Sequence, residues 1–595
     1  MTRKHLAAMI GDSCHRYRRH IAMRYKTDDV WQTITYGELG EKIRQVANAL
    51  IDLGIQPGDM IGIFSQNRAE WTIADFGILS AGAVSVPIYT TNTATQVEYV
   101  VRDADLRALF VGDRNQLAKV QSFAAQYANL QTIVTFDDIG GGTADALPGF
   151  EDLLAKGAEC DHAAESDRRI RDTASESLAS IIYTSGTTGE PKGVMLSHAN
   201  FFHQIAAVDA NFDVGPADRS LCFLPLSHVY ERSWSYYVFS CGAQNNYIQN
   251  PKKVIQYLGE VRPTAMVSVP RLYEKIYAAV MDKLEKASPG KKRLFKWALN
   301  VARRQAGARQ AGRSPGLGLR MAHRLADRLV LRKLRSIVGG QKNFFSAGGA
   351  PLSRNIEEFF LATGLLICQG YGLTETAPMI TCNAPHDFKF GTVGKPVPGC
   401  EVEIGAQNEI LVKGPNVMMG YYKKPEATAA VLVDGWFRTG DVGRIDAGGF
   451  LVITDRIKDL IITSGGKNIA PQRIETAVGR DHYIEQITTI GDRRKYVSAL
   501  IVPSYEALED YAREKGLRYQ SREALLLHPE IVAFYRARVD RQSTELAGFE
   551  TIKTFTLLPN EFTQESGEIT PTQKIRRKVI EKHYRREIDA MYPDD

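Results

Sequence analysis

The chain has 595 residues, of which 44% are hydrophobic, 24% charged and 9% aromatic, and it carries a formal net charge of +6. These values are typical of an ordinary soluble globular protein that is too long for one hydrophobic core, so several subdomains are expected. The net charge is mild for this length and gives no reason to expect a nucleic-acid partner.

Seven cysteines are scattered along the chain without a C-x-x-C motif or a paired spacing with histidine. This usage predicts reduced thiols in a cytoplasmic protein and argues against a zinc or iron–sulfur site. The apolar stretch that follows Arg3, Lys4 and His5 is too short for a signal peptide. No run approaches the roughly 18 uninterrupted apolar residues that a membrane span needs.

Helical and strand patterns alternate between Trp31 and Ala174. Helices are predicted over residues 35–53, 69–82 and 95–103, with one more between the last two strands, and strands over residues 60–64, 83–89, 108–111 and 132–135. Near-continuous apolar strands that alternate with helices predict an α/β fold with a doubly wound, mostly parallel sheet. The polar stretch 140–173 is expected to be a surface excursion.

A segment rich in glycine and hydroxyl groups, Y-T-S-G-T-T-G-E-P-K-G-V-M-L-S-H, occupies residues 183–198 and follows the strand-like run 178–183. Its glycines allow close backbone approach, its hydroxyl groups donate hydrogen bonds and its lysine adds a point charge, which favours a phosphate cradle over a flexible surface loop. These residues are Gly186, Gly189 and Gly193, then Thr184, Ser185, Thr187 and Thr188, and finally Lys192. The ordinary P-loop pattern does not fit, because it needs glycine where Pro191 stands and Ser or Thr where Gly193 stands.

The next segment is expected to form a helix over 200–212 and a strand over 220–225. That strand delivers the polar residues 227–232 at its end, the usual place for site residues in such sheets. A second alternating unit covers 254–270.

Residues 288–341 are strongly basic and contain one acid, Asp327. Two amphipathic helices split by Ser314-Pro315-Gly316 are predicted. Their apolar faces comprise Leu294, Trp297, Ala298 and Val301 in the first helix and Met321, Leu325, Leu329 and Leu334 in the second. Two interpretations stay open: a helical insertion packed on the core with a solvated basic face, or a landing surface for anionic lipid headgroups that holds the protein peripherally on the inner face of the membrane.

In the remainder of the chain the predicted secondary structure changes twice. Short strands at 344–347 and 364–368 lead into glycine-rich segments, and 391–445 indicates a small β-rich subdomain. A new α+β alternation then runs to the end, with strands expected over 488–490, 498–502 and 552–558. We therefore expect a large N-terminal domain over 1–455, a small mobile α+β domain over 456–595 and a hinge at about 455–459.

The order Thr-Ser-Gly-Thr-Thr-Gly followed by Pro-Lys-Gly resembles the signature loop of the adenylate-forming superfamily, which includes acyl-CoA synthetases, peptide-synthetase adenylation domains and luciferases. In that family the loop holds the β and γ phosphates of ATP. The resemblance covers essentially the whole chain and is closest to long-chain fatty acyl-CoA synthetases. It implies a Mg²⁺-dependent reaction in which ATP activates a long-chain fatty acid to acyl-AMP with release of pyrophosphate, followed by transfer to coenzyme A.

The resemblance also implies roles for the segment Q-G-Y-G-L-T-E-T at 369–376. Tyr371 would stack near adenine, Thr374 would bind the α-phosphate, and Glu375 would hold Mg²⁺ together with Thr184, because this hard cation prefers oxygen ligands. The rest of the implied nucleotide-binding set is Gly348, Gly349, Ala350, Gln369, Gly370 and Gly372.

Three further motifs complete the implied adenylation site. Asp441 in W-F-R-T-G-D would accept hydrogen bonds from both ribose hydroxyls, since a carboxylate has two oxygens for a diol. Arg456 in the hinge motif D-R-I-K-D would also reach the ribose, and Lys458 would absorb the backbone change of a domain rotation. Lys574, in G-E-I-T-P-T-Q-K, would bridge the incoming carboxylate and the α-phosphate.

The segment S-G-G-K-N-I-A-P at 464–471 resembles the glycine-rich turn that lines the tunnel for the pantetheine thiol of coenzyme A. This gives Gly465, Gly466 and Lys467 a role in thioester formation. Because Lys574 and Gly465 lie on one small domain but serve different half-reactions, the resemblance implies that this domain alternates between two orientations.

In L-P-L-S-H-V-Y-E-R, His228 would lie at the mouth of the acyl site and steer the substrate carboxylate; a structural histidine is the alternative. Some bacterial relatives have a gating tryptophan four residues later. Arg232 stands at that position, so the acyl gate is unassigned and Trp234 does not take that role.

Other functions stay open. They are a fatty acyl-AMP ligase that delivers to a carrier protein, an acyl-CoA synthetase for a shorter or aromatic acid, a luciferase-like oxygenase, and a lipid-binding or scaffolding protein with a dead nucleotide site. The intact set Lys192, Glu375, Asp441, Arg456 and Lys574 argues against a dead site. The sequence offers no measure of acyl length and does not distinguish a monomer from a homodimer.

Overall fold

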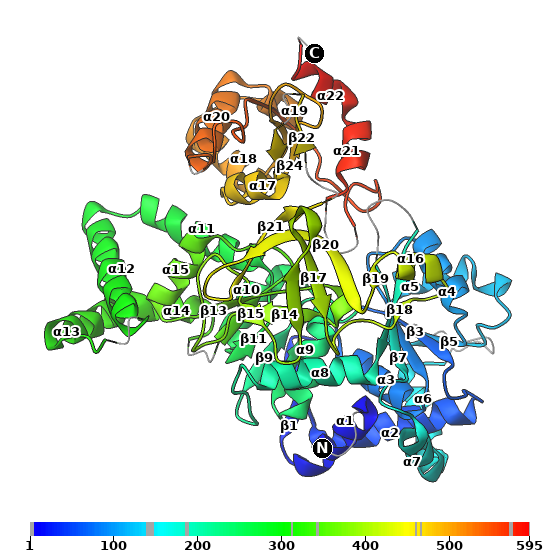
Figure 1. The fold of residues 1–595 in the computed structure, drawn as a ribbon. Coiled ribbons are helices and arrows are strands. Elements are labelled where there is room, and N and C mark those ends of the chain that lie inside the picture. The colour runs from blue at the N-terminus through cyan, green and yellow to red at the C-terminus, as the bar shows by residue number, and fades with distance from the viewer. Residues whose placement is uncertain are drawn as a thin grey trace.

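A large N-terminal body and a smaller C-terminal domain make up the chain (Figure 1). The structure is a computed structural model, and it describes residues 5–138, 148–184, 190–310, 313–340, 344–457, 461–464, 467–544, 546–570 and 575–593. Each of the seven cysteines lies in these ranges and is a free thiol. Among the helices described, none combines the length and the apolar character needed to cross a bilayer.

A seven-stranded sheet with strand order β18-β8-β7-β4-β3-β5-β6 forms the centre of the N-terminal body. Its strands are β3 (Met60–Phe64), β4 (Val84–Ile88), β5 (Ala108–Val111), β6 (Thr132–Thr135), β7 (Leu178–Thr184), β8 (Lys192–Ser197) and β18 (Gly420–Tyr421). The five strands from β7 to β6 are parallel, while β8 and β18 are antiparallel additions at one edge. The predicted α/β class is confirmed, and the sheet is mixed because the signature segment forms a hairpin.

The helices around this sheet follow the predicted alternation. They are α1 (Leu6–Arg16), α2 (Tyr36–Asp52), α3 (Ala69–Ser80), α4 (Ala94–Ala104), α5 (Arg114–Gln121), α6 (Phe150–Glu159), α7 (Ala163–Asp172), α8 (His198–Asp209) and α9 (Val229–Ser240). Every residue of α3 except Glu70 is buried, as expected for a helix that is apolar around its circumference.

Three further sheets extend the N-terminal body. One has the order β2-β1-β10-β9, from β1 (Ile21–Thr27), β2 (Val30–Thr35), β9 (Arg219–Cys222) and β10 (Gln244–Tyr247). The next has the order β11-β12-β13-β14-β15, from β11 (Ala265–Met266), β12 (Phe344–Ala347), β13 (Ile367–Gly372), β14 (Met379–Cys382) and β15 (Lys395–Pro396). The predicted β-rich part is the antiparallel sheet of β16 (Glu401–Ile404), β17 (Glu409–Lys413), β19 (Leu432–Val433), β20 (Trp436–Ile445) and β21 (Leu451–Arg456).

The C-terminal domain, whose described part begins at Ile461, has its own hydrophobic cores. Its strands are β22 (Ile461–Ile462), β23 (Asn468–Ile469), β24 (Ile484–Ile490), β25 (Ser498–Pro503) and β26 (Thr554–Leu557). Its helices are α17 (Pro471–Gly479), α18 (Tyr505–Glu514), α19 (Arg522–Leu526), α20 (Pro529–Gln542), α21 (Arg577–His583) and α22 (Arg585–Ala590). The α+β character expected from the sequence is confirmed.

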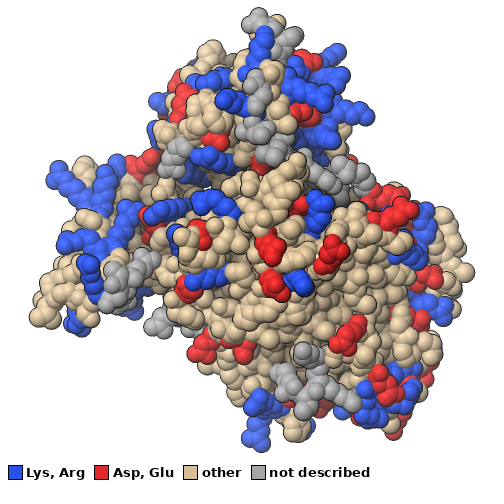
Figure 2. Space-filling view, viewed as in Figure 1, with Lys and Arg blue, Asp and Glu red and all other residues tan. Residues whose placement is uncertain are grey.

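The basic insertion projects from the body as an arm (Figure 1). The helices beside the arm are α10 (Val254–Val261), α11 (Pro270–Glu285) and α15 (Arg354–Thr363). The arm consists of α12 (Pro289–Gln310), α13 (Leu317–Ala326), the π-helical turn Asp327–Leu331 and α14 (Arg332–Ile337). The short helix α16 (Pro425–Ala429) lies apart from the arm, beside β18 and β19. Figure 2 shows lysine and arginine side chains over this arm. The two predicted helices are confirmed, and a π-helical turn and a third helix follow them.

The predicted packing of the arm is partly wrong. Ala298 and Val301 are buried as expected, and Leu334 packs partly against the core. Leu294, Trp297, Met321, Leu325 and Leu329 are exposed instead. The physical reason is that α13 uses the neighbouring face, through Leu319, Ala322 and Ala326, to pack on the arm, so its long apolar side chains point outward.

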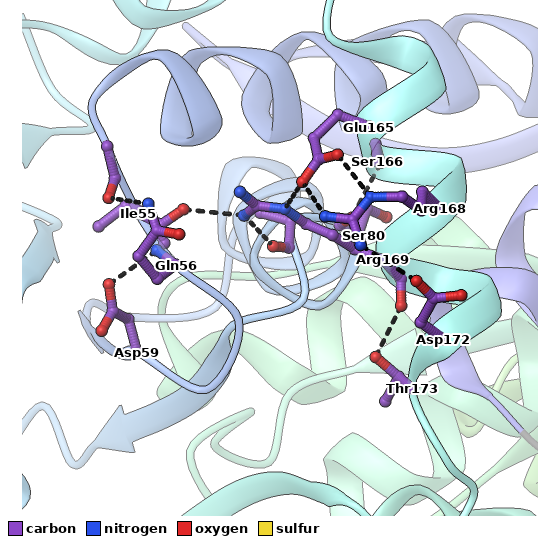
Figure 3. A network of polar contacts seen from close by, with 12 residues as sticks. Ile55, Gln56, Asp59, Ser80, Glu165, Ser166, Arg168, Arg169, Asp172 and Thr173 are labelled. Carbon is purple, nitrogen blue, oxygen red and sulfur yellow. Dashed lines mark hydrogen bonds and ion pairs between the residues drawn. The ribbon is translucent and has the colours of Figure 1, made fainter.

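The stretch 140–173 is not the plain surface excursion that the sequence suggested. Residues 139–147 lie outside the described ranges, but α6 buries Phe150, Leu153 and Leu154 against the core. Helix α7 is fastened through Arg169, which is 6% exposed. Its Nη1 donates to the backbone oxygens of Ile55 and Ala81, both at 2.8 Å (Figure 3).

We expect Arg169→Ala to lower the free energy of unfolding of the N-terminal body by about 2–3 kcal/mol, because two buried carbonyl groups lose a charged donor. The matched control is Arg168→Ala, whose half-exposed side chain pairs with Glu165 and Asp172 on the helix surface and should cost at most about 1 kcal/mol. Urea and thermal unfolding measure both variants. Equal losses for the two variants would contradict the role assigned to Arg169.

Candidate active site

The signature segment is the turn of an antiparallel hairpin. Thr184 at the end of β7 pairs with Lys192 at the start of β8, and the Thr184 hydroxyl donates to the Lys192 backbone oxygen at 3.4 Å. The loop residues Ser185, Gly186, Thr187, Thr188 and Gly189 lie outside the described ranges. A strand, not a helix, follows the loop, so this segment differs from the P-loop in structure as well as in sequence.

Two tyrosines secure the ends of this loop to α4. The Tyr183 hydroxyl donates to Asp103 Oδ2 at 2.6 Å, and the Tyr99 hydroxyl donates to the Pro191 backbone oxygen at 3.1 Å. Burial and the adjacent Asp103 carboxylate raise the pKa of Tyr183, so its hydroxyl stays a donor. Helix α4 therefore positions both the last strand residues before the loop and the residues just after it.

Tyr421 brings two predicted site residues together. It lies in β18, paired with Val194 of β8, and its hydroxyl donates to Glu375 Oε1 at 2.9 Å. The Lys192 ammonium lies 4.7 Å from the centre of the same ring, within cation–π range. Burial, and then the Glu375 carboxylate, raise the pKa of Tyr421. Lys192 and Glu375 thus both contact Tyr421, and Thr184 is the strand partner of Lys192.

Sequence reasoning did not identify Tyr421. The signal that was available is weak: a Gly-Tyr-Tyr run between two motifs, which carries no chemistry of its own. Only the pairing of β18 with β8 reveals its place, because that pairing joins segments that are more than two hundred residues apart.

The segment 369–376 crosses from β13 into the 3-10 turn Thr374–Thr376, which carries Thr374 and Glu375. Gln369 is buried, and its Oε1 accepts from the Leu352 backbone N–H at 2.8 Å, which ties the Gly348-Gly349-Ala350 loop to β13. Gly372 has no room for a side chain, since a Cβ atom would lie 1.8 Å from the Pro378 backbone oxygen.

The glycines at 348, 349 and 370 serve different steric needs. A Cβ on Gly348 would lie 3.1 Å from the Tyr230 ring, and one on Gly370 would lie 3.4 Å from the Thr381 backbone oxygen. Gly349 has φ of +83°, a conformation that favours glycine, and Gly349 and Ala350 are exposed. The loop thus presents its backbone outward at Gly349 and Ala350.

Asp441 is the centre of a second cluster. The Tyr371 hydroxyl donates to its Oδ2 at 2.6 Å, and Arg456 Nε donates to its Oδ1 at 2.7 Å across the β20–β21 pair. Burial and then Asp441 raise the pKa of Tyr371. Each carboxylate oxygen has a second lone pair, so the carboxylate retains acceptor capacity for a diol. The structure brings Asp441 and Arg456 together, and it gives Tyr371 a hydrogen bond that sequence reasoning did not foresee.

His228 is the N-cap of α9, where its Nδ1 accepts from the Tyr230 backbone N–H at 3.1 Å. Its ring lies 6.5 Å from the buried ring of Tyr89, and burial followed by the Glu375 carboxylate raises the pKa of Tyr89. Tyr89 therefore connects the surroundings of His228 with those of Glu375. It was not predicted from sequence.

The turn that leads to His228 is held by two side chains. Asn67 Nδ2 donates to the Leu224 backbone oxygen at 2.6 Å, and its Oδ1 accepts from the Leu226 backbone N–H at 2.9 Å. Glu231 is fully buried and accepts from the Leu224 backbone N–H at 3.1 Å, while burial raises its pKa to about 8. Neither role could be read from a motif.

Arg232, which stands where some relatives have a gating tryptophan, is 1% exposed. Its guanidinium forms an ion pair with Asp75 of α3 and donates to Ser180 of β7 at 2.7 Å and to Tyr236 at 2.8 Å. Ser85 of β4 also donates to Asp75, at 2.6 Å. Arg232 is therefore a buried structural residue that joins α9 to the central sheet.

The C-terminal domain contributes less described geometry. Lys467 directly precedes β23, its backbone N–H donates to Thr463 Oγ1 at 3.2 Å, and its ammonium lies 5.9 Å from the Phe549 ring. Lys458, Gly465, Gly466 and Lys574 lie outside the described ranges. On either side of residues 571–574, Ile569 and Ile575 form an antiparallel bridge.

We expect Asp75→Leu to lower the free energy of unfolding by about 3–5 kcal/mol, because it leaves the Arg232 guanidinium buried without a counter-charge. The double variant Asp75→Leu/Arg232→Met buries neither charge, so it should be more stable than Asp75→Leu alone. Denaturant unfolding of the single and double variants measures this coupling. If the losses of Asp75→Leu and Arg232→Met simply add, the pair is not the unit described above.

Comparison with known proteins shows which family the chain is similar to. Residues 11–422 match the AMP-binding enzyme family, and residues 458–595 match the AMP-binding enzyme C-terminal domain. A long-chain-fatty-acid–CoA ligase, FadD15 of Mycobacterium bovis, is 37% identical over 99% of this chain and 97% of its own length. The peroxisomal long chain acyl-CoA synthetase 7 of Arabidopsis thaliana is 32% identical over 97% of this chain and 84% of its own length.

Solved structures share the fold. The adenylation domain of a carboxylate reductase from Mycobacterium chelonae superposes with a TM-score of 0.78 at 22% identity, covering 99% of this chain and 91% of that one. An anthranilate CoA ligase in complex with anthranoyl-AMP gives a TM-score of 0.73 at 19% identity, covering 98% and 97%. These structures share the fold, and the two family matches together with the full-length relatives show that the chain belongs to the AMP-binding enzyme family, the adenylate-forming superfamily.

Proposed function

We propose that the protein is a long-chain fatty acid–CoA ligase that forms acyl-AMP from ATP and a fatty acid, releases pyrophosphate, and transfers the acyl group to coenzyme A with release of AMP. The observation that carries this proposal is that Tyr421 contacts both Glu375 and Lys192, the strand partner of Thr184 in the signature hairpin. The full-length relatives, whose names specify long-chain acyl-CoA formation, support the choice of substrate class.

Attack of a carboxylate on the α-phosphorus builds negative charge that the site must neutralise. Lys192 and the hydroxyl and backbone donors of the signature loop would bind the β and γ phosphates. The Glu375 carboxylate and the Thr184 hydroxyl are hard oxygen ligands that fit Mg²⁺, which would offset the phosphate charge. Thr374 would bind the α-phosphate, and Asp441 with Arg456 would bind the ribose.

The second half-reaction needs another orientation of the C-terminal domain, with a hinge at 455–459 between domains 1–455 and 456–595. The described contacts between the domains are polar, which suits a mobile interface. Arg271 of α11 donates to the backbone oxygens of Gly479, Ile484 and Glu485, and Gln564 donates to Gln96 of α4. The Gln564 contact lies just before the Lys574 loop and on the helix that anchors the signature loop, which supports adenylation as the present orientation.

His228 would steer the carboxylate of the acid, and Tyr89 and Tyr230 would line its approach. A fatty acyl-AMP ligase that uses a carrier protein and a synthetase for shorter or aromatic acids are the alternatives. We favour coenzyme A as acceptor because of the turn with Gly465, Gly466 and Lys467. For the location of the protein we propose the cytoplasm, as a monomer or homodimer, with peripheral contact to the inner face of the membrane from which long-chain acids are drawn.

The function is tested with a panel of saturated and unsaturated acids from acetate to very long chains, with coenzyme A and a carrier protein compared as acceptors. We expect Mg²⁺-dependent formation of acyl-CoA from palmitate or oleate, with AMP and pyrophosphate as products. ADP as product would overturn the mechanism, and a preference for the carrier protein would overturn the acceptor.

Single substitutions should block one half-reaction and leave the other intact. Lys574→Ala is expected to lower acyl-AMP formation by about 10²-fold or more, since it removes a charge used in the transition state, while thioester formation from supplied acyl-AMP persists. Gly465→Val is expected to do the reverse. Lys578→Ala, an exposed lysine on α21, is the control. Loss of both half-reactions in Lys574→Ala would contradict the role given to that lysine.

A further inference from the structure

Helix α13 has apolar side chains on two faces, and only one of them is covered by the arm. Leu319, Ala322 and Ala326 pack inward. On the other side, Leu317, Met321, Leu325 and Leu329 are 79%, 70%, 52% and 41% exposed. Their spacing of four residues places them in one row along the helix. Such a row of large apolar side chains is unusual on a surface that faces only water.

Arginines flank this row. Arg320, Arg324 and Arg328 are exposed on α13 and the turn that follows it, each one residue before or three residues after a member of the row. The single acid of the arm, Asp327, is already paired with Arg335 at 2.6 Å. Figure 2 shows the resulting cluster of basic side chains over α12 and α13. The arm thus combines an outward apolar row with an excess of basic over acidic residues.

A groove of about 640 Å³ lies next to the row, between α12 and α13. It is lined by Arg313, Arg320, Arg324, His323, Gln305 and the Ser314–Pro315 turn. Several guanidinium groups around one recess match the geometry of a phosphate group.

We propose that the arm docks on an anionic phospholipid bilayer, with Leu317, Met321, Leu325 and Leu329 inserted among the acyl chains and the groove between α12 and α13 holding a lipid phosphate. A helix in the plane of the interface places its apolar face below the headgroups and its arginines at their level. This inference deepens the peripheral membrane contact proposed above and does not depend on the ligase chemistry.

The basic charge of the arm favours an anionic bilayer over the other partners that could cover the apolar row. A second copy of the arm would bring two basic surfaces together, which is unfavourable. A bilayer rich in phosphatidylglycerol satisfies the arginines and the apolar row at once. A soluble acidic protein would satisfy the arginines without needing large apolar residues in a continuous row.

The test is co-sedimentation of the full-length protein with vesicles of phosphatidylcholine alone or with added phosphatidylglycerol, at several salt concentrations. We expect binding to the anionic vesicles to weaken at least about 10-fold in Leu317→Gln/Met321→Gln/Leu325→Gln and in Arg320→Gln/Arg324→Gln/Arg328→Gln. The arginine variant should also lose most of the salt dependence. Controls are Leu527→Gln/Val532→Gln and Arg493→Gln/Arg513→Gln, which change exposed residues of the C-terminal domain.

Insertion of the apolar row into the bilayer is measured separately, by tryptophan fluorescence. The fluorescence of Met321→Trp should shift to the blue with anionic vesicles, and that of Leu527→Trp should not. Turnover of detergent-dispersed acid should be unchanged in the arm variants, which verifies that they fold. If the wild-type protein does not bind any vesicle, the membrane contact and this inference both fail. If it binds but the arm variants bind equally well, only this inference fails, and loss of binding in the arginine variant alone overturns the insertion.

Discussion

The buried ion pair between Arg232 and Asp75 holds together the parts of the N-terminal body that carry the site. Arg232 lies one turn after His228, whose backbone oxygen accepts from the Arg232 backbone N–H at 3.2 Å. The same guanidinium reaches Ser180 of β7, the strand that ends at the signature loop. Separating this pair would leave a buried charge with neither a counter-charge nor water around it, so the two side chains stay together. His228 and the signature loop are thereby fixed in one frame.

The regular elements were predictable because their patterns are local. Strands β3, β5 and β6 have the bounds that their apolar runs predicted, and α3 is buried as its composition suggested. Helix α7 was missed, because a polar, arginine-rich stretch looks like a surface loop until the carbonyl groups that receive Arg169 are known. The outward face of α13 was assigned wrongly for a related reason: amphipathic spacing identifies an apolar face but not which surface covers it.

In the candidate site, too, residues in short local motifs were predictable, and residues that reach the site through contacts between distant segments were not. Motif residues such as Glu375, Asp441 and Arg456 could be named from sequence, because each stands in a short diagnostic segment. Tyr421, Tyr89 and Asn67 could not, since they reach the site through strand pairing and turns that join distant segments. Their chemistry is ordinary: a hydroxyl or an amide becomes informative only when the atom that it contacts is known.

Arg456 belongs both to the candidate ribose site and to the proposed hinge. It is the last residue of β21, it is bound to Asp441, and it stands within the proposed hinge. If the ion pair differs in strength between the two proposed domain orientations, a nucleotide that changes its strength would also change the balance between them. Thermodynamic linkage makes the effect reciprocal, so the orientation of the C-terminal domain must alter nucleotide affinity by the same factor. A nucleotide that binds one orientation of the domain more tightly than the other would, by the same relation, shift the domain toward that orientation.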